Sequence, residues 1–410
     1  MPELKERDAE VFGILKNELK RQDTQINLIA SENYASKAVL EALGSVATNK
    51  YSEGYPGNRY YGGNRFIDEL ESLAIERAKK LFKAEHANVQ PLSGAPANLA
   101  VYSALLNPGD VVLGMDLTHG GHLTHGHPVT LPAKIYKFVR YKTTTEGLID
   151  FEEVERLAKE HKPKIILCGY SSYSRDLDYK RFKEIADSVG AYTMADVAHI
   201  AGMIAAGAMN NPVPIFDVVT TTTHKSLRGP RGGMIFCREE LQKQIDRAVF
   251  PGLQGGPHQN NIAALAVALK EASTEDFREY AFQILKNAKI ICKTLKGNGF
   301  KIEFGTTENH LVLTDVTCLG VGGKQAQDIL ESVGIIINKN VIPDDRRGPQ
   351  DPSGIRIGTP AITTRGFKEK EAESVSETIS GVLKNVGDKN ILKEAGNTVK
   401  ELCSKFPIYK

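Results

Sequence analysis

The segment Thr220-Thr-Thr-Thr-His-Lys-Ser-Leu-Arg-Gly-Pro-Arg-Gly232 joins a β-rich run to a loop of glycines and arginines. The run from Phe216 to Thr223 favours a strand because it is rich in β-branched residues, and Lys225 follows it closely. Another strand-like run, residues 191–195, is followed directly by Asp196. In sheets built from parallel strands, functional groups gather at the carboxyl ends of the strands. We therefore expect Lys225 and Asp196 to share one site.

This lysine and acid suit one cofactor, pyridoxal phosphate. Its aldehyde is held as a Schiff base by a lysine, and its ring nitrogen is kept protonated by a carboxylate. A lysine is a nucleophile only as the free amine, and we expect the neighbouring cations His224, Arg228 and Arg231 to favour that form. The alternative is an ordinary solvated lysine after a strand. The four threonines, the histidine and the glycine-rich turn around Lys225 favour the cofactor.

Strand-like and helix-like runs alternate through the first two thirds of the chain. Strands are expected at residues 87–90, 111–114, 135–139, 165–168, 191–195, 218–221 and 233–237, and helices at 95–106, 151–160 and 179–189. Alternation of this kind predicts an α/β fold, with a mainly parallel seven-stranded sheet covered by helices on both faces.

The flanking regions follow different patterns. Apolar residues at helical spacing predict helices over residues 8–22 and 66–82, whereas residues 51–63 contain too many turn formers for a regular element. A long helical stretch, 260–296, is expected to lead into a smaller α+β part. That part has expected strands at 301–304, 310–315, 335–338 and 355–358, a helix at 324–333 and two closing helices. We predict an N-terminal arm (1–55), a large cofactor-binding domain (56–275) and a small C-terminal domain (276–410).

Composition narrows the class of protein. The 410 residues have a formal net charge of +2, which implies no strong field for nucleic acid or acidic membranes. No apolar run reaches the roughly 18 residues that span a bilayer, and the charged start lacks a signal-peptide pattern. The five cysteines are dispersed without a CxxC motif, as in reduced cytosolic proteins. We therefore expect a cytoplasmic protein with no membrane or nucleic-acid partner.

Two glycine-rich segments are candidates for phosphate binding. Ser93-Gly-Ala-Pro-Ala-Asn98 follows an expected strand and opens a helix, where small residues let backbone N–H groups approach an anion. A plain N-capped helix with Ser93 as its cap would give the same pattern. Gly252-Leu-Gln-Gly-Gly-Pro257 would close over the same phosphate, or form a turn before the long helix.

Histidines gather in Thr118-His-Gly-Gly-His-Leu-Thr-His-Gly-His127. Imidazoles are common metal ligands, but no HExxH motif or cysteine partner accompanies them, and the glycines indicate a loop. We therefore predict no metal site, and expect one of these rings to stack on the cofactor. In Asp196-Val-Ala-His199, the acid suits the pyridinium nitrogen and His199 suits the phenolate side of the ring. A helix N-cap with a surface histidine is the alternative.

Arg356 lies in Ser353-Gly-Ile-Arg-Ile-Gly-Thr-Pro360, where it alternates with apolar residues. An inward guanidinium would clamp a carboxylate with two hydrogen bonds, and an outward one would be a solvated charge. The spacing alone does not decide between them.

The ordered set of motifs resembles the serine hydroxymethyltransferase family from end to end. The matching segments are Leu28-Ile-Ala-Ser-Glu-Asn-Tyr34, residues 51–63, 90–98, 117–126 and 196–202, the Lys225 segment, Phe250-Pro-Gly-Leu-Gln-Gly-Gly-Pro257 and Gly354-Ile-Arg-Ile-Gly-Thr-Pro-Ala361. The resemblance implies a fold-type-I pyridoxal-phosphate transferase of one-carbon and amino-acid metabolism. It also implies a homodimer or dimer of dimers that converts serine and tetrahydrofolate to glycine and 5,10-methylenetetrahydrofolate, through aldimine and quinonoid intermediates.

The resemblance also assigns roles to residues of this chain. The implied catalytic residues are Lys225, Glu53, His224, Tyr51 and Tyr61, with Glu53 moving a proton on the hydroxymethyl side. The implied cofactor-binding residues are Ser93, Gly94, Ala95, His122, Ser171, Asp196, His199, Thr222, Arg231, Gly255 and Gly256. The implied substrate-binding residues are Ser31 and Arg356 for the amino acid, and Leu117, Gly121, His122 and Leu123 for folate. Glu53, both tyrosines and the two glycines of the 252–257 loop are implied to come from the partner subunit.

Two departures from the family pattern are visible. Ala95 stands where some members have serine, and residues 344–350 differ from the pattern of bacterial members before the Arg356 segment. Rival interpretations are another fold-type-I enzyme, such as a threonine aldolase or a desulfurase, or a non-catalytic metal- or folate-binding protein built on the histidine cluster. A desulfurase needs a mobile-loop cysteine, and an aldolase does not need the folate segments.

Overall fold

The structure, a computed structural model, describes residues 2–409. The chain forms two compact units. One is Ala35–Phe282, and the other combines the residues before Ala35 with those from Gln283 onward.

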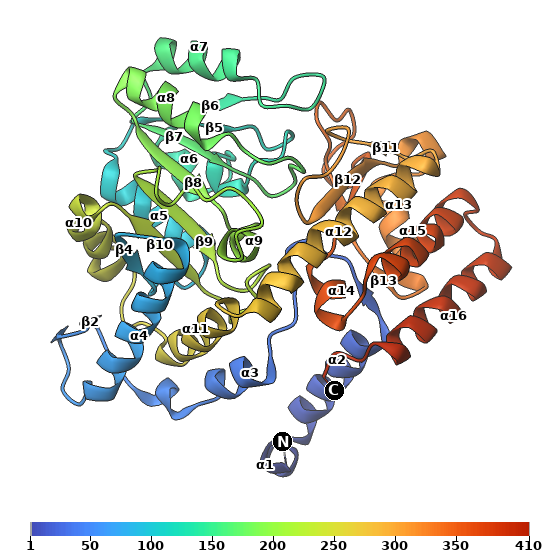
Figure 1. Ribbon diagram of the computed structural model, residues 1–410, viewed down its shortest axis with the longest axis horizontal. Helices are drawn as coiled ribbons and strands as arrows, with labels where there is room; N and C mark the ends of the chain where they lie inside the picture. Colours follow the sequence, from blue (N-terminus) through green and yellow to red (C-terminus); the bar gives the residue numbers. More distant parts are fainter. Residues whose placement is uncertain (1, 410) are drawn as a thin grey trace. The chain divides into compact units, whose positions relative to one another are not determined.

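The larger unit is built on a seven-stranded sheet with the strand order β4-β10-β9-β8-β7-β5-β6 (Figure 1). The strands are β4 (His86–Asn88), β5 (Val111–Met115), β6 (Lys137–Tyr141), β7 (Ile165–Gly169), β8 (Tyr192–Asp196), β9 (Val218–Thr222) and β10 (Gly233–Cys237). Strands β5 to β9 pair in parallel, whereas β10 runs antiparallel to β4 and β9. The predicted α/β fold with a mainly parallel sheet is confirmed, since each expected strand overlaps one of these seven.

The helices of this unit pack on the sheet or against one another. They are α3 (Lys37–Leu43), α4 (Arg65–Phe82), α5 (Gly94–Leu105), α6 (Leu131–Ile135), α7 (Phe151–His161), α8 (Tyr179–Val189), α9 (Ala201–Ala205), α10 (Gln242–Arg247) and α11 (Gln259–Ala272). Ala97 and Val101 recur at helical spacing along α5 and pack with Leu167 and Met194 of the sheet. Helices α7 and α8 contact each other and strands β5 to β8. The apolar positions of α5 therefore lie on the face that packs against the sheet.

Two expectations for this unit need correction. The stretch 260–296 is not one helix, because α11 ends at Ala272 and α12 (Glu275–Gly297) starts anew. The Thr274 hydroxyl accepts a hydrogen bond from the Phe277 backbone at 3.3 Å, which caps the new helix. Residues 51–63 are not without regular structure either. They contain an antiparallel hairpin of β2 (Gly54–Tyr55) and β3 (Asn58–Arg59).

The smaller unit has a four-stranded antiparallel sheet in the order β11-β12-β15-β14. Its strands are β11 (Lys301–Ile302), β12 (Leu311–Asp315), β14 (Asn338–Asn340) and β15 (Gly354–Gly358), and β1 (Ile26–Asn27) pairs in parallel with β13 (Ile335–Ile336). Its helices include α1 (Pro2–Arg7), α2 (Ala9–Thr24), α13 (Gly323–Ser332), α14 (Pro360–Arg365), α15 (Glu369–Lys384) and α16 (Lys389–Lys405). The single strand expected over 335–338 is wrong, because β13 and β14 belong to different sheets.

Leu28, Val312 and Ile379 are buried in one core of this unit. The earliest part of the chain therefore packs with its last third. Among the described residues, none of the helices combines the length and apolarity that crossing a membrane requires.

Candidate active site

Asp196, the last residue of β8, is the centre of a buried polar cluster. Its Oδ2 accepts a hydrogen bond from Asn98 Nδ2 at 2.8 Å and lies 3.2 Å from His125 Nε2. Its Oδ1 accepts from the Ala198 backbone N–H at 3.0 Å. The carboxylate is thus held from α5, from the histidine-rich loop and from the segment that follows its own strand.

The electrostatics of Asp196 favour the charged form. Burial by itself raises the pKa of this carboxyl, but the hydrogen bonds that Asp196 accepts from His125 and Asn98, with the favourable electrostatics of the His125 and His122 rings, together hold the pKa below its usual range. His125 Nδ1 accepts from the His122 backbone N–H at 3.2 Å, so its proton is assigned to Nε2, which faces Asp196. Asp196 is therefore a buried carboxylate that stays ionised at neutral pH.

Asn98 connects three elements around this carboxylate. Its Oδ1 accepts from Thr220 Oγ1 of β9 at 2.6 Å, so its amide nitrogen is directed to Asp196 and, at 2.8 Å, to Thr124 Oγ1. Neither Asn98 nor His125 was assigned an individual role from the sequence. The sequence did signal Asn98 in part, since it is a polar residue on the buried face of α5 among alanines.

Lys225 is buried and lies three residues beyond the end of β9. The loop that follows folds back on Thr223. The Thr223 hydroxyl donates to the Pro230 carbonyl at 2.6 Å, and the Gly229 N–H donates to the Thr223 carbonyl at 2.7 Å. This glycine- and proline-rich turn therefore encloses Lys225. The alternative of an ordinary solvated lysine does not agree with this burial.

The cations expected near Lys225 are only partly as predicted. Burial, with the charges of Arg231 and Lys225, lowers the pKa of His224 to about 3, so His224 is neutral and the prediction that it is a cation is wrong. The Arg228 guanidinium lies over the Tyr280 ring, 4.2 Å from its centroid, in a cation–π contact. Arg231 is exposed, and its positive charge contributes to lowering the pKa of His224.

The amino end of α5 begins at the predicted phosphate segment. The Ser93 side chain makes no capping hydrogen bond to the helix it precedes, so the plain N-cap alternative is not observed among the described residues. A Cβ added at Gly94 would lie 2.8 Å from the Thr222 methyl group, so only glycine fits against β9 there. Ala95 is exposed. First-turn N–H groups of a helix lack intrahelical partners, and this end therefore suits an anion.

The other predicted cofactor residues lie near these groups. His122 Nδ1 is 2.7 Å from Thr124 Oγ1, and its ring centroid is 5.6 Å from that of His125. Thr222 Oγ1 donates to the Ala198 carbonyl at 3.2 Å, and the buried His199 accepts through its carbonyl from Ser226 at 3.0 Å. The Ser171 N–H donates to the Gly120 carbonyl at 2.7 Å, which joins the loop after β7 to the histidine-rich loop.

The expected folate segment occupies the loop after β5. Gly121 fits tightly there, because an added Cβ would lie 2.3 Å from the Met115 carbonyl oxygen. Leu117 is half-buried and Leu123 is 47% exposed, so an apolar side chain of this loop is open to solvent.

The residues expected from a partner subunit cluster together in this chain. The Tyr51 hydroxyl is 3.3 Å from Glu53 Oε1, and the Tyr51 and Tyr61 rings pack edge to face at 4.9 Å. A Cβ added at Gly255 would lie 3.4 Å from Glu53 Oε1, and one at Gly256 would lie 3.4 Å from the Tyr51 ring. The hairpin and the 252–257 loop therefore form one surface, on which Tyr51 and Tyr61 are exposed.

The ligand atoms of His122, His125 and Asp196 lie within 4.8 Å of one another, close enough to surround a metal ion. These atoms also take part in the hydrogen bonds described above. The predicted absence of a metal site stays a prediction.

The smaller unit carries the two residues expected to bind the amino acid. Arg356, on the interior strand β15, is 8% exposed, so the inward alternative holds. Its Nε donates to Asn338 Oδ1 at 3.1 Å, and burial lowers the pKa of the guanidinium to about 10. A buried cation of this kind is stabilised by an anion. Ser31 is half-buried in the loop after β1.

Comparison with known proteins agrees with the motifs. The profile of the family described as "Serine hydroxymethyltransferase" matches residues 4–379. A curated relative, "Serine hydroxymethyltransferase" of Desulfotalea psychrophila (strain LSv54 / DSM 12343), is 54% identical over 407 residues, which cover 99% of this chain and 96% of the relative.

Proposed function

The chain belongs to the serine hydroxymethyltransferase family, and we propose that it transfers the hydroxymethyl carbon of serine to tetrahydrofolate. The reversible reaction gives glycine and 5,10-methylenetetrahydrofolate. One observation supports this function most directly: a buried, ionised Asp196 ends β8, and a buried Lys225 follows β9, the neighbouring parallel strand. A carboxylate and an amine in this relation are what pyridoxal phosphate requires.

The residues fit this cofactor. Asp196 would hold the protonated ring nitrogen, Lys225 would carry the aldehyde, and His122 would stack on the ring. Ser93, Gly94 and Ala95 would bind the phosphate at the start of α5, where the contact between Gly94 and Thr222 leaves room for backbone only. Ser171, Thr222 and His199 would surround the ring oxygen, and Arg231, Gly255 and Gly256 would complete the cofactor site.

Bound pyridoxal phosphate would supply an electron sink for the substrate α-carbon. The chain's own residues would position the reactants and move protons. Lys225 would hold and then release the aldehyde carbon, and a neutral His224 beside it would avoid adding a third charge to those of Lys225 and Arg231. Glu53 would transfer the proton on the hydroxymethyl side, with Tyr51 and Tyr61 packed around it.

The two substrates would use separate residues. Arg356 would bind the amino-acid carboxylate through its planar guanidinium, and Ser31 would assist it. Leu117, Gly121, His122 and Leu123 would contact folate. We further propose a fold-type-I arrangement in the cytoplasm, with homodimers or dimers of dimers in which Glu53, Tyr51, Tyr61, Gly255 and Gly256 serve the neighbouring active site.

Serine cleavage measured with and without tetrahydrofolate tests this function. We expect the purified protein to be yellow, to lose its colour with borohydride, and to form glycine from serine rapidly only when tetrahydrofolate is present. Equal rates with and without folate, together with faster cleavage of threonine, would indicate an aldolase instead. A colourless protein with bound metal would contradict the proposal altogether.

A further inference from the structure

A buried arginine holds the backbone on both sides of Glu53. The Arg59 side chain is 3% exposed, and its Nη1 donates to the carbonyls of Ser52 and Gly54, each at 2.8 Å. The carbonyl of Glu53 itself accepts from the Tyr60 N–H at 3.0 Å. Three consecutive peptide carbonyls are thus fixed, and the direction in which the Glu53 side chain leaves the backbone is fixed with them.

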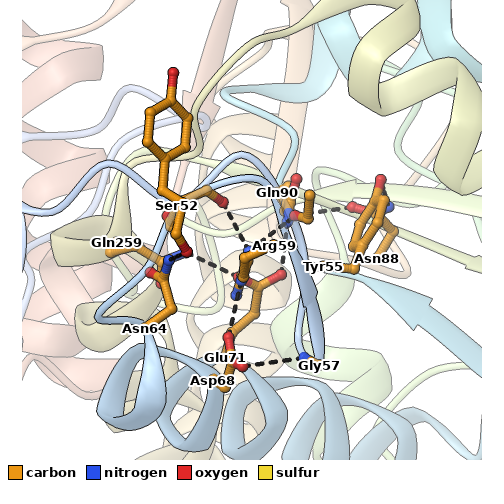
Figure 2. A network of polar contacts seen from close by, with 12 residues as sticks. Ser52, Tyr55, Gly57, Arg59, Asn64, Asp68, Glu71, Asn88, Gln90 and Gln259 are labelled. Atoms are coloured by element: carbon orange, nitrogen blue, oxygen red, sulfur yellow. Dashed lines mark hydrogen bonds and ion pairs between the residues drawn. The ribbon is translucent and has the colours of Figure 1, made fainter.

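Glu71 of α4 balances this buried cation. Its side chain is 1% exposed, and its Oε2 accepts from Arg59 Nη2 at 2.6 Å (Figure 2). Its two oxygens also accept from Gln90 at 2.7 Å and from Gln259 at 2.8 Å. A buried guanidinium without such a partner is strongly unfavourable, so Arg59 depends on Glu71 to remain between the two carbonyls.

The two glutamines extend the same network back to the hairpin. Gln90 Nε2 donates to the Gly54 carbonyl at 2.9 Å, and Gln259 Nε2 donates to Ser52 Oγ at 3.0 Å. Gln259 begins α11, and only His258 separates it from the 252–257 loop that Glu53 and Tyr51 contact. One carboxylate therefore orients both the hairpin and the loop that faces it.

We propose that Glu71 is a positioning residue for Glu53, acting through Arg59, Gln90 and Gln259. The inference rests on the proposed role of Glu53 in proton transfer. Misplacement of a reacting group by about 1 Å can slow a reaction roughly a hundredfold, which sets the size of the expected effect.

Asp68 offers a matched control on the same arginine. It accepts from Arg59 Nε at 2.8 Å and from the Gly57 N–H at 3.0 Å at the hairpin tip, and its side chain is 28% exposed. It therefore binds Arg59 without touching the peptides on either side of Glu53. Asp68→Asn should lower stability while kcat stays within about threefold of the parent.

The first test compares Glu71→Gln with Asp68→Asn in the complete holoenzyme. We expect Glu71→Gln to lower kcat for folate-dependent serine cleavage by about a hundredfold, with the serine KM and the cofactor content close to those of the parent. An unchanged kcat, or an equal fall in both variants, would overturn the inference. If Glu71→Gln does not fold, Gln90→Met removes the bonds to Glu71 and Gly54 without stranding a charge, and the same split between kcat and KM is expected.

The second test repeats the substitution in a Glu53→Gln background. If Glu71 acts through Glu53, the double variant should have the kcat of Glu53→Gln alone, because residues that act as a unit are not additive. A further large fall would mean that Glu71 has a general structural role, and would overturn the inference. A Glu53→Gln variant with parental kcat would refute the role of Glu53 and this inference with it, while the folate-dependent serine cleavage of the parent would still stand.

Discussion

The Oδ2 atom of Asp196 lies 3.2 Å from Nε2 of His125, and both side chains are buried. Because Nδ1 of the same imidazole accepts the His122 N–H, the tautomer that donates to Asp196 is fixed. A second donor, Asn98, reaches the same oxygen at 2.8 Å. The carboxylate is thus prepared for a cationic partner before any cofactor binds.

Asp196→Asn should weaken cofactor binding and abolish most serine cleavage, because a neutral amide does not stabilise a protonated pyridinium. Losing one member of a buried charge pair costs roughly 3–5 kcal/mol. Equilibrium dialysis of pyridoxal phosphate measures the loss directly. Asp217→Asn is the control, since Asp217 accepts from Thr193 N and Oγ1 and precedes the start of β9. Parental affinity in Asp196→Asn, or equal weakening in both variants, would contradict the assignment.

The lowered pKa of Asp196 predicts a definite dependence of stability on pH. A group whose pKa is lower in the folded than in the unfolded state stabilises the fold above its unfolded pKa, about 3.9 for aspartate. This contribution is lost as the pH falls through the folded value. In cofactor-free protein, the difference in unfolding free energy between the parent and Asp196→Asn should shrink as the pH falls from about 5 to about 3. Urea unfolding across this range would contradict the prediction if the difference grew in acid.

The sequence predicted the larger sheet well because each of its strands is a short apolar or β-branched run bounded by turn residues. Residues 165–168 and 218–221, for example, are buried on both faces and leave no polar alternation to interpret. The smaller unit was harder. β13 is separated from β14 because β13 pairs with β1, which lies more than 300 residues earlier in the chain. Local periodicity does not indicate a partner so distant in the sequence.

The candidate site was predictable in its placement, because the strand-like runs that end at Asp196 and shortly before Lys225 are easily recognised in the sequence. It was not predictable where a common residue takes its role from three-dimensional contacts. Asn98 is an amide in an alanine-rich helix, and Glu71 is one of several acids in α4. Only packing shows that Asn98 joins two strands and that Glu71 is fully buried. The predicted positive charge of His224 was wrong for the same reason, since the residue type does not show whether the side chain is buried.

Lys225→Gln should abolish multiple turnover and leave pyridoxal phosphate bound, because the contacts from Asp196 and from the start of α5 remain. Lys225→Arg should behave alike, since a guanidinium cannot form the Schiff base or return a neutral amine. Absorbance after gel filtration reports retained cofactor, and glycine formation reports turnover. A Gln variant that cleaved serine at the parental rate would remove the central assignment.

Shared active sites predict complementation between two inactive chains. Glu53 and Tyr51 form one surface with Gly255 and Gly256, and Tyr51 is 55% exposed, as expected for residues that reach into a neighbour. Mixing Lys225→Gln with Glu53→Gln chains should restore activity, because one site of each hybrid carries neither lesion. Differently tagged chains would establish that subunits exchange. Exchange without recovered activity would mean that each site is built within one chain.

Arg356→Lys separates substrate binding from cofactor binding. Arg356 is buried on β15, and burial lowers the pKa of its guanidinium to about 10, a cost that an anionic partner would offset. Lysine keeps the charge but loses the planar fork that binds a carboxylate at two points.

A charge-assisted hydrogen bond contributes roughly 1.5–3 kcal/mol, so the loss of one or two should lower kcat/KM for serine by about ten- to a thousandfold or more. The cofactor should remain bound, and folate affinity should change little. Arg365→Lys is the matched control in the same unit, because that arginine is also buried but donates to backbone carbonyls, among them those of Asp23, Gln25 and Phe406. It should lower the unfolding temperature and leave serine affinity unchanged. Serine titrations that gave the parental affinity in Arg356→Lys would place the carboxylate anchor elsewhere in the chain.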